Sequence, residues 1–170
     1  MRYLSVTSPD INNGTGCRVT VWVAGCSHCC KECHNPWTWD YNQGEEDIWD
    51  TLCEKLSLPY IKGVTFSGGD PLSQNDKSLR DLAFLIGRVK TMFPEKDVWL
   101  FTGDVYEEAI KNPLKSRIID MCDVVVDGPF KFYLRDTSLA FRGSSNQRII
   151  LINENYPYEI KDAIKKSEIQ

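Results

Sequence analysis

Three cysteines, Cys26, Cys30 and Cys33, are spaced C-x3-C-x2-C directly after an apolar, valine-rich run at about residues 18–24. That run predicts a buried strand, so the cysteines lie on the loop that follows it. Three thiolates on one short loop can hold three irons of a 4Fe-4S cluster and leave the fourth iron open to a bound molecule. An open iron indicates chemistry rather than simple electron storage.

The other cysteines give no sign of a disulfide framework. The chain has seven cysteines, an odd number, and four of them lie between residues 26 and 33. The first ten residues contain no apolar leader, so reduced thiols or metal ligands fit this pattern better than disulfides. Cys17, Cys53 and Cys122 lie in or near apolar segments, and we expect them to pack as small core residues.

Length and charge limit the kind of protein further. With 170 residues the chain suits one domain, 1–170, that buries a core of its own. A net charge of -4 gives no basic footprint, so no nucleic acid partner is expected. No window approaches the roughly 18 consecutive apolar residues of a membrane-spanning helix. We therefore expect a cytoplasmic protein that has no membrane partner.

The pattern of apolar residues predicts an α/β fold. Buried strands are expected at about 18–24, 61–67, 97–102, 122–127 and 147–152. Helical spacing occurs at 45–56, 75–92 and 106–112, and the charged tail at 159–170 is expected to be a surface helix or a frayed end. Alternating strands and helices predict βαβ units and a mostly parallel sheet, either open or curled into part of a barrel.

Each distinctive loop begins where one of these predicted strands ends. The loops are the cysteine loop and the segments 67–71, 102–104 and 127–130. In parallel α/β folds the carboxyl ends of the strands share one edge of the sheet, and ligands bind at that edge. The sequence therefore predicts that four loops far apart in the chain converge on one site.

The cysteine loop has a plainer interpretation as part of a zinc site. Structural zinc needs four ligands, and His28, His34 or Cys29 could supply the fourth. The loop at the end of the next predicted strand favours the cluster over zinc.

That second loop, Ser67 to Pro71, could be no more than a strand-to-helix turn. Its functional interpretation is more specific. Gly68 and Gly69 have no Cβ and would let a ligand approach the backbone closely, while Asp70 offers a carboxylate suited to an ammonium group. Trp37 and Trp39, after the cysteine loop, fit either core packing or a surface for a partner protein.

Six blocks spread over nearly the whole chain carry a family resemblance: residues 13–18, 25–39, 65–72, 99–103, 127–129 and 142–148. The cysteine block resembles that of radical S-adenosylmethionine enzymes. The last block, Arg-Gly-Ser-Ser-Asn-Gln-Arg, together with the short length, resembles the family that activates anaerobic ribonucleoside-triphosphate reductase.

The resemblance implies Cys26, Cys30 and Cys33 as the cluster ligands, with Cys29 outside the set. S-adenosylmethionine would chelate the fourth iron through its amino and carboxylate groups. The resemblance also implies a set of contacts to this cofactor. The amino group would lie at Gly68, Gly69 and Asp70, the adenine at Glu32, Cys33 and His34, and further contacts at Thr102, Asp127 and Arg148.

The activity that the resemblance implies is the generation of a glycyl radical on the reductase. A flavodoxin-like or ferredoxin-like protein would supply one electron, and S-adenosylmethionine would be cleaved to methionine and a 5'-deoxyadenosyl radical. That radical would take hydrogen from a glycine Cα, and no general acid or base is needed. Because the substrate is a loop of another protein, we expect an open, truncated (βα) partial barrel of about five or six strands.

Two other functions remain open at this point. A small-molecule radical S-adenosylmethionine enzyme of the deazaguanine-forming type shares the size and the cysteine chemistry, and product analysis would separate it. A zinc or redox-switch binding module would be colourless, whereas an iron-sulfur protein purified without oxygen is brown.

Overall fold

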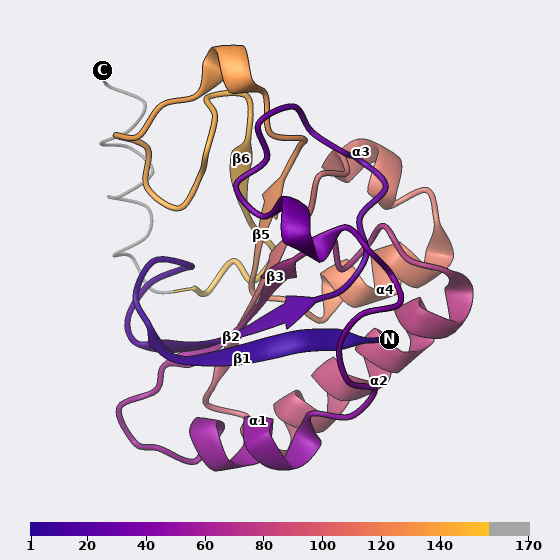
Figure 1. The fold of residues 1–170 in the computed structure, drawn as a ribbon. Coiled ribbons are helices and arrows are strands. Elements are labelled where there is room, and N and C mark those ends of the chain that lie inside the picture. Colours follow the sequence, from indigo (N-terminus) through magenta and orange to yellow (C-terminus); the bar gives the residue numbers. More distant parts are fainter. Residues whose placement is uncertain (157–170) are drawn as a thin grey trace.

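The computed structural model describes residues 1–156, and its frame is one six-stranded sheet (Figure 1). The strands lie in chain order: β1 Tyr3–Asp10, β2 Arg18–Val23, β3 Gly63–Gly68, β4 Asp97–Phe101, β5 Val124–Asp127 and β6 Arg148–Leu151. The helices are α1 Trp49–Leu56, α2 Asp76–Met92, α3 Tyr106–Ala109 and α4 Pro113–Asp120, with 3-10 turns η1 Pro36–Thr38 and η2 Phe132–Leu134. The expectation of an α/β fold with five or six strands is confirmed.

The sheet is mixed, so the expectation of a mostly parallel sheet is wrong. Strands β2 to β5 are parallel to their neighbours, but β1 is antiparallel to β2 and β6 is antiparallel to β5. The physical reason is the way the edge strands are connected, because a strand that returns without a crossover helix pairs in the antiparallel direction. Among the six strands of the described residues, β1 pairs with no strand but β2 and β6 with no strand but β5, so the sheet is not closed.

The five strands expected from the sequence are all present, whereas β1 was not predicted. Between its buried end residues its side chains alternate between half-buried and exposed positions, and the exposed Ser5, Thr7 and Pro9 interrupt its apolar character. Proline is tolerated in an edge strand such as this one. The expected tail helix at 159–170 lies outside the described residues.

Two helix predictions also differ from the structure. The helix expected at 45–56 begins only at Trp49, because Glu45 forms two backbone hydrogen bonds with Tyr3, the first residue of β1. Helix α4 was not expected, although its start is marked in the sequence. Asn112 caps it by accepting hydrogen bonds from the next turn, and Pro113 occupies its first position.

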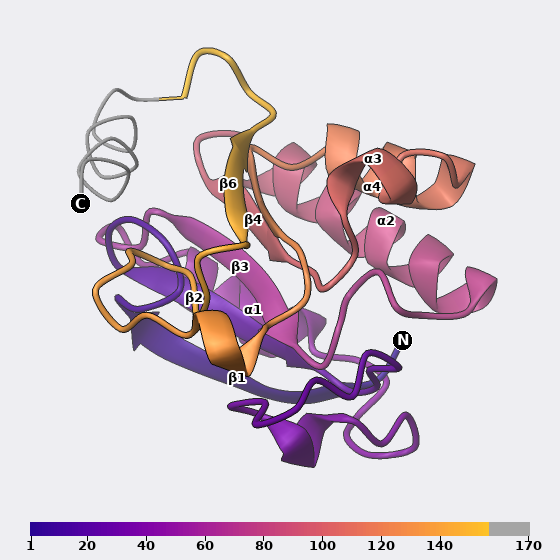
Figure 2. The same ribbon diagram turned by 90° about the horizontal axis from the view of Figure 1, so that it is seen from above.

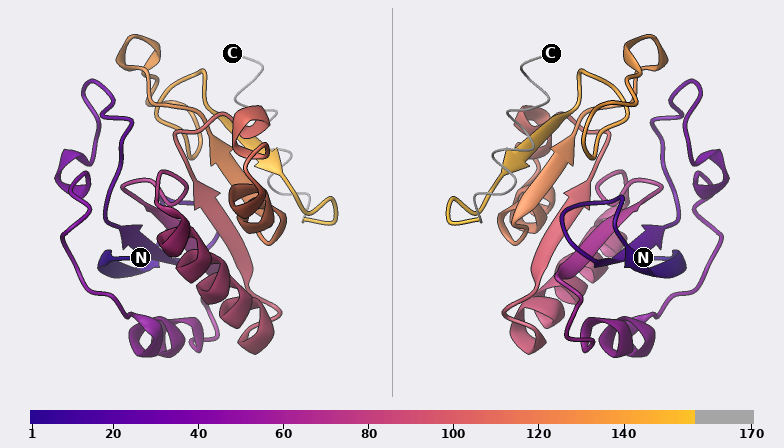
Figure 3. Two further views of the ribbon diagram at one scale, coloured as in Figure 1. Left: turned by 90° about the vertical axis from the view of Figure 1, so that its right-hand side faces the viewer. Right: turned by 90° about the vertical axis from the view of Figure 1, so that its left-hand side faces the viewer.

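The helices cover one face of the sheet, and loops cover the other (Figure 2). Alternation along the strands produces this division. Val98 and Leu100 belong to the large core beneath the helices, whereas Trp99 between them packs in a small cluster with Val124 and Tyr156 on the opposite face. The cysteine loop and η2 both extend beyond the carboxyl ends of the central strands (Figure 3).

Helix α2 follows the β3–α2 loop, and a side-chain cap fixes the position of its first turn. Asn75 accepts a hydrogen bond from the Ser78 amide at 2.9 Å, and the helix buries a stripe of side chains: Leu79, Leu82, Leu85, Ile86 and Val89. It is amphipathic, and no helix in residues 1–156 has the length and apolar character needed to cross a membrane.

Candidate functional site

A pocket of about 390 Å³ lies at the carboxyl ends of the central strands. The cysteine loop and the loops after β3, β4 and β5 all contribute to its wall, so the structure brings the four strand-end loops together as predicted. Asn12 and Asn13 from the β1–β2 loop complete the wall together with five residues of the segment before β6: Leu139, Phe141, Arg142, Gly143 and Gln147. Neither asparagine was expected at the site from the sequence.

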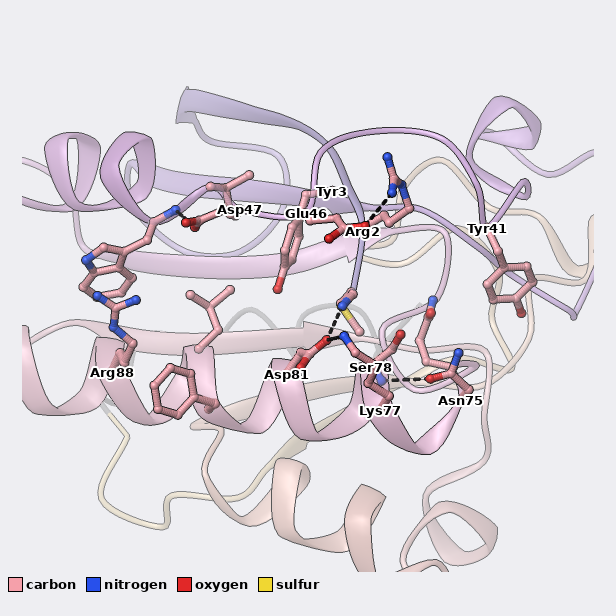
Figure 4. Close-up of a pocket in the computed structure, with 16 residues that line it drawn as sticks. Arg2, Tyr3, Tyr41, Glu46, Asp47, Asn75, Lys77, Ser78, Asp81 and Arg88 are labelled. Carbon is pink, nitrogen blue, oxygen red and sulfur yellow. Dashed lines mark hydrogen bonds and ion pairs between the residues drawn. The ribbon is translucent and has the colours of Figure 1, made fainter.

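A second and larger pocket, of about 590 Å³, lies between β1 and α2, at the start of α1 (Figure 4). Four of its charged side chains form ion pairs with each other: Lys77 lies 3.1 Å from Asp81, and Arg2 lies 2.8 Å from Glu46. Arg88 stacks on the Trp49 ring, with 3.7 Å between the guanidinium carbon and the ring centroid. Because no cysteine lines it, we place the candidate site in the first pocket.

Cys26, Cys30 and Cys33 all line the first pocket, and none of them is in a disulfide. Cys29 is exposed, has a positive φ of 44° and is not part of the pocket wall. Burial raises the pKa of Cys26 to about 11 and also raises that of Cys30, so these two thiols are neutral near pH 7 in the metal-free protein. Three free thiols in one pocket fit a cluster that uses three protein ligands.

The base of the cysteine loop is interlocked with the loop after β3. The amide of Gly69 donates to the Val23 carbonyl at 2.8 Å, and the amide of Asp70 donates to the Gly25 carbonyl at 2.8 Å. A Cβ on Gly69 would lie 2.3 Å from the Gly25 oxygen, so glycine is required at this crossing. The Gln74 side chain strengthens it by donating to the carbonyl of Asp70 at 2.9 Å and of Gly25 at 3.1 Å.

The carboxylate of Asp70 is buried, with 1% of the residue exposed, and it joins two strand-end loops. It accepts hydrogen bonds from the Thr102 hydroxyl at 2.9 Å and the Gly103 amide at 2.8 Å. It also accepts from the amides of Leu72 at 2.8 Å and Ser73 at 3.2 Å, within its own loop. These donors occupy most of the acceptor positions of a carboxylate, so the Asp70 side chain shapes the pocket floor.

His28 connects the cysteine loop to that floor. Its Nε2 lies 2.8 Å from Asp70 Oδ2 and 3.4 Å from Asp104 Oδ1, and Asp104 in turn pairs with Lys115 of α4 at 2.6 Å. Hydrogen bonding to Asp104 and then to Asp70 raises the pKa of His28 to about 10. A Cβ on Gly103 would lie 2.6 Å from the His28 ring, which shows how closely the ring packs there.

Two of the residues expected at the adenine lie on the pocket wall, and one does not. Cys33 and His34 line the pocket, whereas Glu32 is exposed, has a positive φ of 57° and is not part of the wall. The His34 ring packs against Phe130, with ring centroids 5.0 Å apart. Segment 127–130 was expected at the site from the sequence, but Phe130 itself was given no role at the cofactor, although an aromatic residue directly after the Gly-Pro turn at the end of β5 could have indicated one.

Thr102 lines the pocket, whereas Asp127 and Arg148 lie beside it. These two residues face each other in the β5–β6 ladder, and Arg148 Nε donates to Asp127 Oδ1 at 3.1 Å. Arg148 also pairs with Glu107 at 2.8 Å, and the buried Asp127 carboxylate accepts from the Tyr106 amide. The pair fastens β6 and α3 to β5, and its expected role at the cofactor stays a prediction.

Three free thiols from one short loop in one pocket fit the class of single-cluster iron-sulfur proteins. In agreement, a family model described as a 4Fe-4S single cluster domain matches residues 12–150.

The chain is also similar to curated proteins named anaerobic ribonucleoside-triphosphate reductase-activating protein. The relative from enterobacteria phage T4 is 39% identical over 152 residues, which cover 88% of this chain and 93% of the relative. The relative from Escherichia coli K12 is 38% identical over 152 residues, covering 86% and 96%. The relative from Pasteurella multocida is 37% identical over 154 residues, covering 88% and 96%. The chain therefore belongs to the family of anaerobic ribonucleoside-triphosphate reductase-activating proteins.

Proposed function

We propose that the protein is a radical S-adenosylmethionine enzyme that activates anaerobic ribonucleoside-triphosphate reductase by generating a glycyl radical on it. The observation that carries the proposal is the shared pocket, in which Cys26, Cys30 and Cys33 lie together with Gly69 and Asp70. The names of the relatives from phage T4 and Escherichia coli support the choice of the reductase as the target.

Cys26, Cys30 and Cys33 are proposed to hold the 4Fe-4S cluster. The loop of Gly68, Gly69 and Asp70 would hold the amino end of S-adenosylmethionine through its backbone, in the shape that the Asp70 carboxylate imposes. When bound, the two groups supply a one-electron cleavage that yields a radical able to remove hydrogen from a glycine Cα. The remaining proposed contacts to the cofactor are Glu32, Cys33, His34, Thr102, Asp127 and Arg148.

The work left to the protein is orientation and the exclusion of water. The packed rings of His34 and Phe130 offer an aromatic wall for an adenine. The buried carboxylate of Asp70, with its hydrogen-bond donors, keeps the pocket floor fixed. Pre-organised groups of this kind raise the rate of a reaction whose chemistry is supplied by a cofactor.

A protein substrate explains why the sheet can remain open. We infer that the six strands act as a partial barrel within one domain, 1–170, with an open side that admits a glycine-bearing loop of the reductase. Trp37, which is 53% exposed just after the cysteine loop, is suited to a protein contact beside that entrance. A flavodoxin-like or ferredoxin-like protein is proposed as the electron donor.

The test is to mix the anaerobically reconstituted protein with its reductase, S-adenosylmethionine and dithionite and to record electron paramagnetic resonance spectra. The expected result is a glycyl radical on the reductase, together with methionine and 5'-deoxyadenosine as products. Omitting S-adenosylmethionine is the matched control and should abolish the radical. A reconstituted cluster whose spectrum ignores S-adenosylmethionine, with no radical on the reductase, would contradict the proposal.

A further inference from the structure

The cysteine loop has little regular structure of its own to hold it in place. Between Cys26 and Cys33 it contains no helix or strand, and Cys29 and Glu32 have left-handed backbone conformations. One backbone hydrogen bond lies inside the loop, from the Cys33 amide to the Cys30 carbonyl at 3.1 Å. A segment of this kind is ordered mainly by contacts with its surroundings.

Two side chains at the start of the loop provide such contacts. Ser27 is exposed, and its hydroxyl lies 2.6 Å from the hydroxyl of Ser73. His28 reaches further inward, and its Nε2 lies 2.8 Å from Asp70 and 3.4 Å from Asp104. In sequence His28 lies between Cys26 and Cys30, so any movement of its backbone shifts both of these thiols.

The surface that receives His28 is itself rigid. Asp70 is fixed by donors from Thr102 and Gly103, and Asp104 is fixed by Lys115 of α4. Gly103 has no side chain, and this lets the ring pack closely, since a Cβ there would come within 2.6 Å of it. His28 therefore connects the cysteine loop to the ends of β3 and β4 and to α4.

We propose that His28 is a positioning residue that clamps the cysteine loop against Asp70 and Asp104, and so holds Cys26 and Cys30 in their pocket positions before a cluster binds. The inference rests on the proposed function, because it concerns the same site. It assigns to His28 neither a bond to iron nor a contact with S-adenosylmethionine.

The first test uses the metal-free protein and therefore does not depend on activity. His28→Ala, His28→Gln and a control in the same loop, Lys31→Ala, are treated with a thiol-alkylating reagent, and the rate at each cysteine is read by peptide mass mapping. Loss of the clamp should speed alkylation of Cys26 and Cys30 by about tenfold, the equivalent of one hydrogen bond to a charged group. The buried Cys122, far from the loop, should keep its rate.

The alkylation rate of Cys122 distinguishes a local effect of His28 on the cysteine loop from a general effect on the stability of the fold. If it reacts faster in proportion to Cys26 and Cys30, His28 stabilises the whole fold, and the proposal is wrong. Unchanged rates at all three cysteines in His28→Ala also overturn it. The glutamine side chain carries an amide nitrogen with a comparable reach, so His28→Gln should recover part of the slow rate, and Lys31→Ala should match the wild type.

The second test uses the reconstituted protein. Release of iron to a chelator should be about tenfold faster in His28→Ala than in the wild type or Lys31→Ala, although the three thiols are intact. If the wild type takes up a cluster and forms the glycyl radical but His28→Ala releases iron at the same rate, only this inference fails. If the wild type takes up no cluster, the proposed function fails, while the alkylation result still decides the role of His28.

Discussion

The guanidinium of Arg18 pairs with the carboxylate of Asp97 at the amino ends of the central strands, opposite the cysteine loop. Arg18 is fully buried, stacks on Trp99 with 5.3 Å to the ring centroid, and donates to the Thr15 carbonyl at 3.1 Å. Thr15 belongs to the β1–β2 loop, the same loop that carries Asn12 and Asn13 to the pocket. The ion pair thus anchors a loop whose far end forms part of the site.

Replacing Arg18 with methionine should lower the free energy of unfolding by about 3–5 kcal/mol, because the largely buried Asp97 carboxylate would lose its charged partner and keep only the Tyr156 hydroxyl. Urea denaturation of the metal-free protein measures this. The control is Arg2→Met, which removes an exposed ion pair with Glu46 and should cost at most about 1 kcal/mol. Similar losses of unfolding free energy in both variants would show that the buried ion pair stabilises the protein no more than the exposed one.

Substitution of Cys26, Cys30 or Cys33 by alanine should abolish the 4Fe-4S cluster, because each removes one of three proposed ligands from the pocket. Iron and sulfide content and the visible spectrum after anaerobic reconstitution report the result. Cys29→Ala is the matched control: this thiol is exposed and off the pocket wall, and its loss should leave the cluster in place. A full cluster in Cys33→Ala would refute the ligand set.

Asp70→Ala should leave the three thiols able to assemble a cluster but weaken binding of S-adenosylmethionine by roughly 1.5–3 kcal/mol, the range for hydrogen bonds to a charged group. The reason is that Thr102 and Gly103 would lose their shared acceptor and the pocket floor would lose its shape. The spectral change on titrating S-adenosylmethionine into the reduced protein gives the affinity. Asp76→Ala, at the exposed start of α2, should bind as tightly as the wild type.

Gly69→Ala should destabilise the protein by about 1–3 kcal/mol, since its Cβ would be forced to within 2.3 Å of the Gly25 carbonyl oxygen. Gly87→Ala is the counterpart within α2, where an added Cβ meets nothing within 4 Å and better helix propensity should stabilise by about 0.5–1 kcal/mol. Thermal unfolding should show a lower melting temperature for Gly69→Ala and a higher one for Gly87→Ala. Equal shifts of the melting temperature in the same direction would show that the loop crossing tolerates a side chain.

The central strands were predictable from the sequence because they are buried on both faces and consist of nearly continuous apolar runs. Val124 to Val126 is such a run, and all three residues are buried in the structure. The direction of the edge strands was not predictable in this way. It depends on whether a connection contains a crossover helix, and residues 128–147 between β5 and β6 contain no helix other than a 3-10 turn.

The site was predictable to the extent that motifs mark it. The cysteine spacing and the two glycines before Asp70 pointed to two loops that the structure brings together in one pocket. The partners of Asp70 could not be predicted, because the Thr102 hydroxyl and the Gly103 amide come from another strand end and carry no local signal. The positions of Asp127 and Arg148 beside the pocket likewise depend on the register of β6, which a list of apolar runs does not give.

The Asp70 carboxylate also has a dynamic consequence. Because the amides of Leu72, Ser73 and Gly103 all donate to it, none of them can open to solvent without weakening the bonds of the others. Their hydrogen exchange should therefore be cooperative, with similar opening free energies despite their distance in the chain. The floor of the pocket would then open to solvent as one cooperative unit. A ligand that binds to any part of the floor would slow hydrogen exchange at all three amides.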